Sequence, residues 1–300
     1  MTTLFAAAPG KVNLCLFVGR PREDGLHPLV SVMQPVSLAD GLSLEIAGER
    51  DEVLCPGVEG PNLAASALAA YRRAGGWHGP AVRLRIVKRV PVAAGMGGGS
   101  GDAAAALRRA AHAAGRPGDP ILHELAMGLG ADVPAQVEPR RCLVTGAGEN
   151  VRPLEEGPLY ALLVVPSPHA LSTPEVFREA DRMGVPRSPE ELGELEQAVA
   201  AAVAGGGGLP PELAVNDLEP AARRLCPPID DALADVRAAG ADRVMVSGSG
   251  PTVFGVFSGA GPVAAAEAAA SALRPRHPAA AVAVPVGPEF GAVQELSAGA

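Results

Sequence analysis

Hydrophobic and polar residues alternate over short stretches in the first half of the chain. In residues 11–18 (KVNLCLFV) every second residue from Val12 onward is apolar, and Lys11 and Asn13 fall on the opposite face. This period of two is typical of a β-strand with one buried face. Similar patterns predict three more strands, at residues 29–37, 42–46 and 82–90. We therefore expect a sheet here, with Lys11 and Asn13 presented side by side on it.

Helical patterns with recognisable ends lie between and after these strands. Residues 62–75 form one such pattern, with Asn62 at the N-cap position and Gly75 near its end. An alanine-rich stretch predicts a second helix that begins near Asp102, and residues 121–129 predict a third. The start of the second helix is therefore a junction between a strand, a glycine-rich loop and a helix.

The second half of the chain predicts a regular succession of strands and helices. Its expected elements are, in order, a strand at 160–165, helices at 174–183, 189–204, 212–225 and 229–240, strands at 242–247 and 252–257, a helix at 262–273 and a strand at 280–286. With the inserted helices set aside, this is the order β-α-β-β-α-β of a ferredoxin-like domain. A polar, proline-bearing stretch at 152–158 marks the expected boundary. The predicted fold class is therefore α+β, with one domain over 1–153 and a second over 154–290.

The composition is that of a globular protein, and it argues against several classes of function. The chain has 300 residues, of which 48% are hydrophobic and 19% charged, with a formal net charge of −8 and a pI near 5.3. Such an acidic protein is a poor ligand for nucleic acid or an anionic membrane. No apolar run approaches the roughly 18 residues of a membrane helix, and the first residues lack the basic segment of a signal peptide. We predict a cytoplasmic protein with no nucleic-acid or membrane partner, and leave open whether it forms a homo-oligomer.

Five glycines crowd into the segment PVAAGMGGGSGDAAAAL, residues 91–107, at the strand–helix junction. Such a junction aims backbone N–H groups and the positive end of a helix dipole at one point, which binds phosphate without a charged side chain. Ser100 would add a hydroxyl donor; a flexible turn or a close packing corner is the alternative. The order GxxxxGK[ST] is absent, and another predicted helix follows instead of a second strand. Neither a Walker loop nor a dinucleotide-binding fold therefore fits.

Six segments, in the same order along the chain, resemble the motifs of the GHMP small-molecule kinases. They are APGKVNLCLFVGRPREDGLH near the N-terminus, PVAAGMGGGSGDAAAAL, LGADVP (129–134), STPEVF (172–177), NDLEPAA (216–222) and VMVSGSGPTVFG (244–255). The long glycine loop is similar to that of one branch of this family, whose members phosphorylate an alcohol of a cytidine nucleotide. The resemblance implies a two-domain GHMP kinase fold, with an N-terminal ATP-binding α+β domain, a C-terminal ferredoxin-like domain and an active site between them.

The resemblance also implies a set of chemical roles. Transfer of a phosphoryl group from ATP to an alcohol needs a cradled triphosphate, a cation against developing charge, and a group that accepts the hydroxyl proton. Matching to the family places the proton acceptor at Asp132 and its cationic partner at Lys11, one of only two lysines in the chain. The alternatives are a local turn hydrogen bond for Asp132 and a solvated strand end for Lys11. ATP implies Mg²⁺, whose protein ligands the sequence does not identify.

The other expected site residues follow from the same matching. The ATP site would be formed by Asn62, Lys88, Pro91, Gly95, Gly97, Gly98, Gly99, Ser100 and Gly101. The substrate site would be formed by Asn13, Leu26, His27, Thr173, Phe177, Gly248, Ser249 and Gly250. For Asn62 and Lys88 a helix cap and a surface charge are the alternatives. One position departs from the family, because Leu26 stands where related chains carry an aromatic residue that stacks on cytosine.

The function expected from the resemblance is ATP-dependent phosphorylation of the 2-hydroxyl of 4-diphosphocytidyl-2-C-methylerythritol, a small cytidine-nucleotide substrate, in non-mevalonate isoprenoid synthesis. Leu26 keeps open the alternative of another GHMP kinase that acts on homoserine or a mevalonate-type alcohol. A nucleotide-binding sensor without catalysis is a second alternative, against which the presence of both Lys11 and Asp132 speaks.

Overall fold

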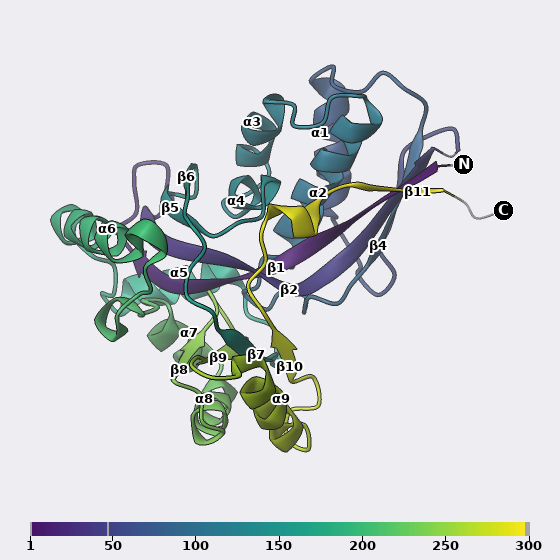
Figure 1. Cartoon of the computed structure of the whole chain (residues 1–300). Coiled ribbons are helices and arrows are strands. Elements are labelled where there is room, and N and C mark those ends of the chain that lie inside the picture. Colours follow the sequence, from purple (N-terminus) through teal and green to yellow (C-terminus); the bar gives the residue numbers. More distant parts are fainter. Residues whose placement is uncertain (1, 47, 298–300) are drawn as a thin grey trace.

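The first half of the chain is built around a large, mainly antiparallel sheet. The computed structural model describes residues 2–46 and 48–297 (Figure 1). This sheet contains β1 (Thr2–Val18), β2 (Leu29–Ile46), β3 (Glu52–Leu54), β4 (Val82–Val87), β5 (Cys142–Gly146), β6 (Asn150–Pro153) and β11 (Gln294–Ser297). Its order is β11-β1-β2-β4-β3, and β5 pairs with both β2 and β6. The pairs are antiparallel apart from β3 with β4, which are parallel and joined through a helix.

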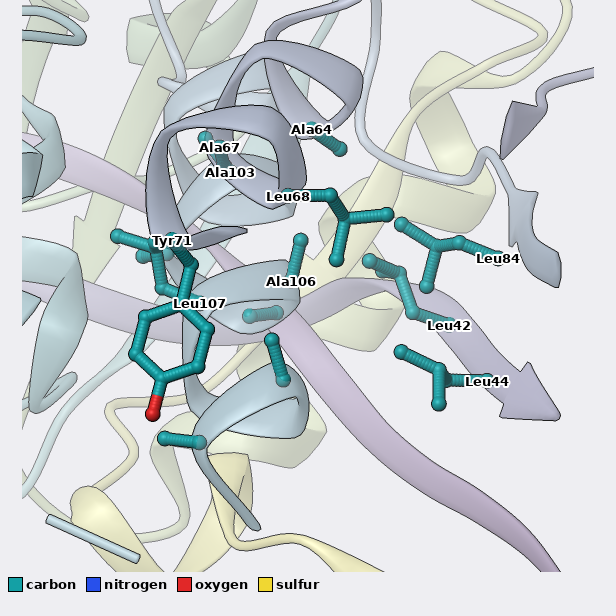
Figure 2. Close-up of a cluster of buried hydrophobic side chains, with 14 of the residues drawn as sticks. Leu42, Leu44, Ala64, Ala67, Leu68, Tyr71, Leu84, Ala103, Ala106 and Leu107 are labelled. Atoms are coloured by element: carbon teal, nitrogen blue, oxygen red, sulfur yellow. The ribbon is translucent and has the colours of Figure 1, made fainter. Parts of the chain in front are cut away.

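The helices in the described residues of this half are α1 (Leu63–Arg73), α2 (Gly98–Ala113), α3 (Ile121–Met127) and α4 (Val133–Val137). Figure 2 shows the buried cluster in which α1 and α2 meet the sheet. The α2 side of the cluster is largely alanine, and Ala103 to Ala106 are fully buried. Because an alanine side chain is only a methyl group, α2 can approach its neighbours closely while Leu42 and Leu84 fill the space on the sheet side. The N-terminal end of α2 is thereby held in a fixed position.

The second half of the chain contains a smaller sheet of four strands. These are β7 (Ala161–Val165), β8 (Arg243–Val246), β9 (Val253–Phe257) and β10 (Ala281–Ala283), in the antiparallel order β10-β7-β9-β8. The helices are α5 (Thr173–Arg182), α6 (Pro189–Val203), α7 (Glu219–Leu225), α8 (Pro228–Ala238) and α9 (Pro262–Leu273), with 3₁₀ turns at Ala204–Gly206, Pro211–Leu213 and Pro288–Gly291. The predicted α+β class and the β-α-β-β-α-β order are confirmed. The exact division at residue 153 stays a prediction.

The long strands β1 and β2 connect the two halves of the molecule. They run across it from the end that carries both termini, and the second sheet lies on one side of them (Figure 1). Leu16 of β1 donates its N–H to Val215 and accepts from the N–H of Asp217, each at 2.8 Å. Ser37 of β2 donates to the carbonyl of Val284 at 2.8 Å. Residues of β1 are therefore held by backbone contacts to both halves.

The main differences from the predicted elements lie in three places. Residues 29–46 form one strand, because Asp40 and Gly41 pair in register with β1 despite the polar interruption that suggested two strands. The helix predicted from Asp102 begins at Gly98, so that the glycines form its first turn. The helix predicted over 212–225 is broken, because the side chain of Asn216 donates to the carbonyls of Val246 and Gly248 and holds an extended segment before α7.

In the described parts of the chain, 2–46 and 48–297, no helix is both long enough and apolar enough to cross a membrane.

Candidate active site

A cavity of about 530 Å³ lies between the two halves of the chain. Segments from both halves line it: β1, the loop before α1, the glycine-rich loop and Asp132 from the first half, and the start of α5 and the loop after β8 from the second. Most of the predicted site residues lie on its wall. The predicted residues that are not on the wall are Leu26, His27, Gly101 and Gly250.

The glycine-rich loop and the first turn of α2 form one wall of the cavity, where Pro91, Gly95, Gly97, Gly98, Gly99 and Ser100 are all exposed to it. Gly97 is the N-cap of α2 in a left-handed conformation with φ of 65°, and no side chain caps the helix. The first N–H groups of a helix have no partner within it, and the helix dipole adds positive potential there. This wall therefore offers backbone donors to an anion.

The glycines of this loop differ in the space that a side chain would find at each position. At Gly95, φ is 75° and a Cβ would lie 2.0 Å from the carbonyl oxygen of Ser247. A Cβ at Gly101 would lie 2.9 Å from the oxygen of Pro9, and one at Gly98 would lie 3.0 Å from Val90. At Gly99, by contrast, a Cβ would meet no atom within 4 Å. The loop is thus a close packing corner at Gly95, Gly98 and Gly101, whereas Gly99 leaves open space beside the helix N–H groups. The packing interpretation is confirmed, and phosphate binding stays a prediction.

Lys11 and Asp132 meet at the wall next to this loop. The ammonium of Lys11 lies 3.3 Å from Oδ2 of Asp132 and donates to Oδ1 of Asn13 at 2.8 Å and to the carbonyl of Gly95 at 3.2 Å. Lys11 is buried on β1, whereas the Asp132 side chain is 36% exposed. Asp132 precedes α4 and makes no capping hydrogen bond with it. Its carboxylate is therefore paired with Lys11 and open to the cavity, instead of serving a local turn.

Lys88 lies at another part of the same cavity, between two carboxylates that the sequence interpretation missed. Its ammonium donates to Asp40 and, at 2.8 Å, to Asp102. Burial raises the pKa of Asp102 to about 7, which Lys88 opposes and Asp40 reinforces. Burial lowers the pKa of Lys88, but the charges of Asp102 and Asp40 outweigh it and the pKa is raised overall. Lys88 is therefore not a surface charge, and its ammonium is held in place by two buried carboxylates.

Two more residues with distinct partners, Asn62 and Asp102, lie in this part of the cavity. Asn62 lines the cavity and also caps α1, because Oδ1 accepts from the N–H of Ala64 at 2.9 Å. Asp102 has a side chain that is only 6% exposed, and Oδ1 has no hydrogen-bond partner in the described residues. A lone carboxylate at the start of an alanine-rich helix was the signal in the sequence that could have identified Asp102.

The loop between β8 and β9 brings the second half of the chain onto the glycine-rich loop. The hydroxyl of Ser247 donates to the carbonyl of Gly95 at 3.0 Å, the same oxygen that accepts from Lys11. Gly248 and Ser249 line the cavity, and the hydroxyls of Ser249 and Thr173 lie 2.9 Å apart. Gly250 packs below the loop, where a Cβ would lie 2.9 Å from Val246. Both halves therefore fix the position of Lys11.

The predicted substrate residues gather near the start of α5. Phe177 lines the cavity, and its ring centroid lies 4.9 Å from that of His27. Nε2 of His27 lies 2.8 Å from Oδ1 of Asp181, a residue that the sequence interpretation did not identify. Leu26 is 54% exposed. The structure brings His27 and Phe177 together, whereas Leu26 is exposed and does not line the cavity.

This arrangement has the parts that phosphoryl transfer to an alcohol requires. Backbone donors at the start of α2 can hold a polyphosphate, and Asp132 offers a carboxylate that can accept a proton. Lys11 supplies a positive charge at the same point, where negative charge would develop on a reacting hydroxyl.

Comparison with known proteins gives the same assignment. The model of the GHMP kinases N terminal domain matches residues 62–138, and that of the GHMP kinases C terminal region matches residues 198–275. The chain is 39% identical over 293 residues to the 4-diphosphocytidyl-2-C-methyl-D-erythritol kinase of Anaeromyxobacter dehalogenans, covering 94% of this chain and 89% of that protein. It is 42% identical over 255 residues to the enzyme of the same name from Streptomyces coelicolor, covering 81% and 84%.

A solved structure extends this likeness to the fold. The crystal structure of a 4-(cytidine 5'-diphospho)-2C-methyl-D-erythritol kinase matches with a TM-score of 0.71 and 35% identity, over 94% of this chain and 99% of that one. Both halves of the fold are therefore shared with this structure. The chain belongs to the GHMP kinases and, among them, to the family of the 4-diphosphocytidyl-2-C-methyl-D-erythritol kinases.

Proposed function

We propose that this protein transfers the γ-phosphoryl group of ATP to the 2-hydroxyl of 4-diphosphocytidyl-2-C-methyl-D-erythritol, a step in non-mevalonate isoprenoid synthesis. Membership of the family supports the reaction class and the cytidine-nucleotide substrate. The observation that carries the proposal is the pair formed by Lys11 and Asp132, whose Nζ and Oδ2 lie 3.3 Å apart on the same cavity wall as the first turn of α2, which no side chain caps. An alcohol kinase needs a base and an anion cradle within reach of each other, and this cavity offers both.

In this mechanism Asp132 orients the 2-hydroxyl of the substrate and accepts its proton as the O–P bond forms. Lys11 pairs with the Asp132 carboxylate and stabilises the negative charge that develops on the substrate oxygen. The N–H groups at the start of α2, together with the hydroxyl of Ser100, hold the phosphate oxygens as charge moves onto the leaving ADP. Asn13 and the carbonyl of Gly95 fix the direction of the Lys11 ammonium.

Mg²⁺ fits this site through oxygen ligands. Mg²⁺ generally takes one or two carboxylates, with phosphates and waters completing its shell. Asp102 has a buried Oδ1 that lacks a partner among the described residues and borders the cavity, and Ser100 lies on the same wall. These two residues would hold the ion, and its charge would offset that of the phosphates. Lys88 stays with the other oxygen of Asp102 and keeps that carboxylate oriented.

Leu26 supports a second candidate, a related kinase that acts on a different alcohol. An exposed leucine in place of an aromatic residue removes a stacking contact that, in single-strand nucleic-acid binders, contributes about 1–3 kcal/mol per base. A small alcohol without a base, such as homoserine or mevalonate, would not depend on that contact. A nucleotide-binding sensor without catalysis is a third candidate.

The deciding experiment mixes purified protein with Mg²⁺-ATP and each of three alcohols: 4-diphosphocytidyl-2-C-methyl-D-erythritol, homoserine and mevalonate. ADP and phosphorylated product are followed by mass, and a reaction without any alcohol measures background hydrolysis. We expect product from the cytidine substrate alone. Turnover of only homoserine or mevalonate would replace the substrate but keep the mechanism. ATP binding without any product would support the sensor.

A further inference from the structure

Helix α5 presents a row of three side chains toward the first half of the chain. Thr173, Phe177 and Asp181 are spaced four residues apart, so they follow one another along one face of the helix. Thr173 and Phe177 line the cavity, and Asp181 continues the row one turn further. Sequence reasoning found the first two of these residues by resemblance but gave Asp181 no role.

The partner of Asp181 is His27, which lies in the segment between β1 and β2. Nε2 of His27 is 2.8 Å from Oδ1 of Asp181, and the imidazole lies against Phe177 with ring centroids 4.9 Å apart. The His27 side chain is 9% exposed and that of Asp181 is 38% exposed. The histidine is therefore enclosed between the two halves of the chain, with its orientation set by two residues of α5.

This contact decides which nitrogen of His27 carries the proton. An ionised carboxylate can only accept hydrogen bonds, so Nε2 must be the protonated nitrogen that donates to Asp181. In a neutral imidazole, Nδ1 is then an acceptor with a free lone pair. Across residues 2–46 and 48–297 the structure shows no protein donor for Nδ1.

An acceptor at this position distinguishes between the two pyrimidine bases. Cytosine carries an amino group at C4, which donates a hydrogen bond, whereas uracil carries a carbonyl oxygen there, which accepts one. An Nδ1 lone pair attracts the amino group and repels the carbonyl oxygen. Without Asp181 the imidazole could adopt the other tautomer, and this distinction would weaken.

We propose that Asp181 is a positioning residue that holds His27 as a hydrogen-bond acceptor and so makes the substrate site prefer cytosine to uracil. This inference rests on the proposed function, because it assumes that the base of the substrate reaches His27 and Phe177. Asp181 acts only through His27 and takes no part in phosphoryl transfer.

The test compares two carboxylate-to-amide variants of α5. In Asp181→Asn the side chain keeps its shape but can both donate and accept, so the His27 tautomer is no longer fixed. Glu175→Gln is the matched control. Glu175 is an exposed carboxylate on the same helix, and its contact with Arg178 is a long, solvent-exposed ion pair of 4.0 Å. For Asp181→Asn we expect the KM of the cytidine substrate to rise roughly 3- to 10-fold, the size typical of a charge-assisted hydrogen bond near solvent, with the KM of ATP and kcat unchanged. Glu175→Gln should leave all three unchanged.

Two further readouts do not depend on turnover. Titration calorimetry with CDP and UDP should show that wild-type protein prefers CDP and that Asp181→Asn loses most of this preference. ¹⁵N NMR of histidine-labelled protein should show the Nε2–H tautomer at His27, assigned by its loss in His27→Gln, and a mixture of tautomers in Asp181→Asn.

The outcomes separate this inference from the proposed function. An Nδ1–H tautomer in the wild-type protein, or an unchanged ratio of CDP to UDP affinity in Asp181→Asn, overturns the role of Asp181. Failure of the wild-type protein to phosphorylate the cytidine substrate, with the tautomer and the CDP preference intact, overturns the proposed reaction and leaves the role of Asp181 standing.

Discussion

The two lysines of the chain reach the same cavity from different strands and end in opposite environments. Lys11, on β1, has two neutral acceptors and one carboxylate, Asp132, which is partly open to solvent. Lys88, just after β4, lies between Asp40 and Asp102, both buried and both hydrogen-bonded to it. One ammonium is thus held by weak partners near open space, and the other is enclosed by two opposite charges.

The difference indicates which lysine can take part in chemistry. A reacting substrate has to interact with the catalytic cation, which requires partners that can be shared or replaced at small cost. Lys11 meets that requirement, because neutral oxygens hold it and its carboxylate is already solvated. Lys88 does not, because its departure would leave buried carboxylates without a counter-charge. We therefore assign catalysis to the Lys11 side and structural support of the ATP site to the Lys88 side.

The largest effect is expected on the Lys11 side, from Asp132→Asn. The amide keeps the shape of the side chain but cannot accept the proton of the substrate hydroxyl, so kcat should fall by about 10²–10⁴-fold. The KM of ATP and the melting temperature should change little, because Asp132 caps no helix and is partly exposed. Steady-state kinetics measure kcat and the KM of ATP, and calorimetry measures the melting temperature. Asp231→Asn on α8 is the control, because Asp231 is exposed. Full activity in Asp132→Asn would remove Asp132 from the mechanism.

The next effect tests the comparison directly, by replacing each lysine with methionine. Lys88→Met removes the cation between two buried carboxylates and should lower the free energy of unfolding by about 3–5 kcal/mol. Lys11→Met should lower it less, since Asp132 can be solvated, while nearly abolishing kcat. Urea unfolding of both variants gives the two values. Equal losses of stability would contradict the division of roles between the lysines.

The part of the fold that the sequence predicted is the part governed by short-range patterns. The alternation that begins at Val12 and the cap at Asn62 are local signals, and both appear in the structure as β1 and α1. The helix start was placed at Asp102 because four glycines with one serine do not resemble a helical turn. Packing against Val90 and Pro9 overrides their low propensity, since no residue with a Cβ fits at Gly98 or Gly101 without displacing a neighbour.

What the sequence could not predict depends on contacts between distant segments. Asp40, Lys88 and Asp102 come from a strand, the end of another strand and a helix, and no spacing between them marks their meeting. The same holds for His27 and Asp181, which are 154 positions apart. The ion pair of Lys11 with Asp132, which we propose is catalytic, was predicted only because family motifs carry information about three-dimensional neighbours that periodicity lacks.

A third prediction concerns the pH dependence of stability on the Lys88 side. The pKa of Asp102 is raised from 3.8 to about 7 in the folded protein, mainly by burial. The folded state therefore binds this proton more tightly than the unfolded state, and the resulting stabilisation is lost as the pH rises from about 4 through about 7. Asp102→Asn should remove this loss while keeping an acceptor for Lys88. Between pH 5 and 8 the wild-type protein should lose about 2–3 kcal/mol more than the variant in urea unfolding; parallel curves would contradict the raised pKa.

The smallest effect separates the two uses of glycine in the loop that lies between the lysines. Gly99 is helical, and a Cβ there would meet no atom within 4 Å, so Gly99→Ala should fold and gain up to about 0.5–1 kcal/mol of helix stability. Gly193→Ala in α6 is the matched control, because Gly193 is also helical and unobstructed but lies away from the cavity. Both variants should unfold at slightly higher urea concentration. Only Gly99→Ala should raise the KM of ATP, by roughly tenfold, because its methyl group would stand where the helix N–H groups receive the phosphates. If both variants bind ATP like the wild-type protein, the first turn of α2 at Gly99 does not receive the phosphates.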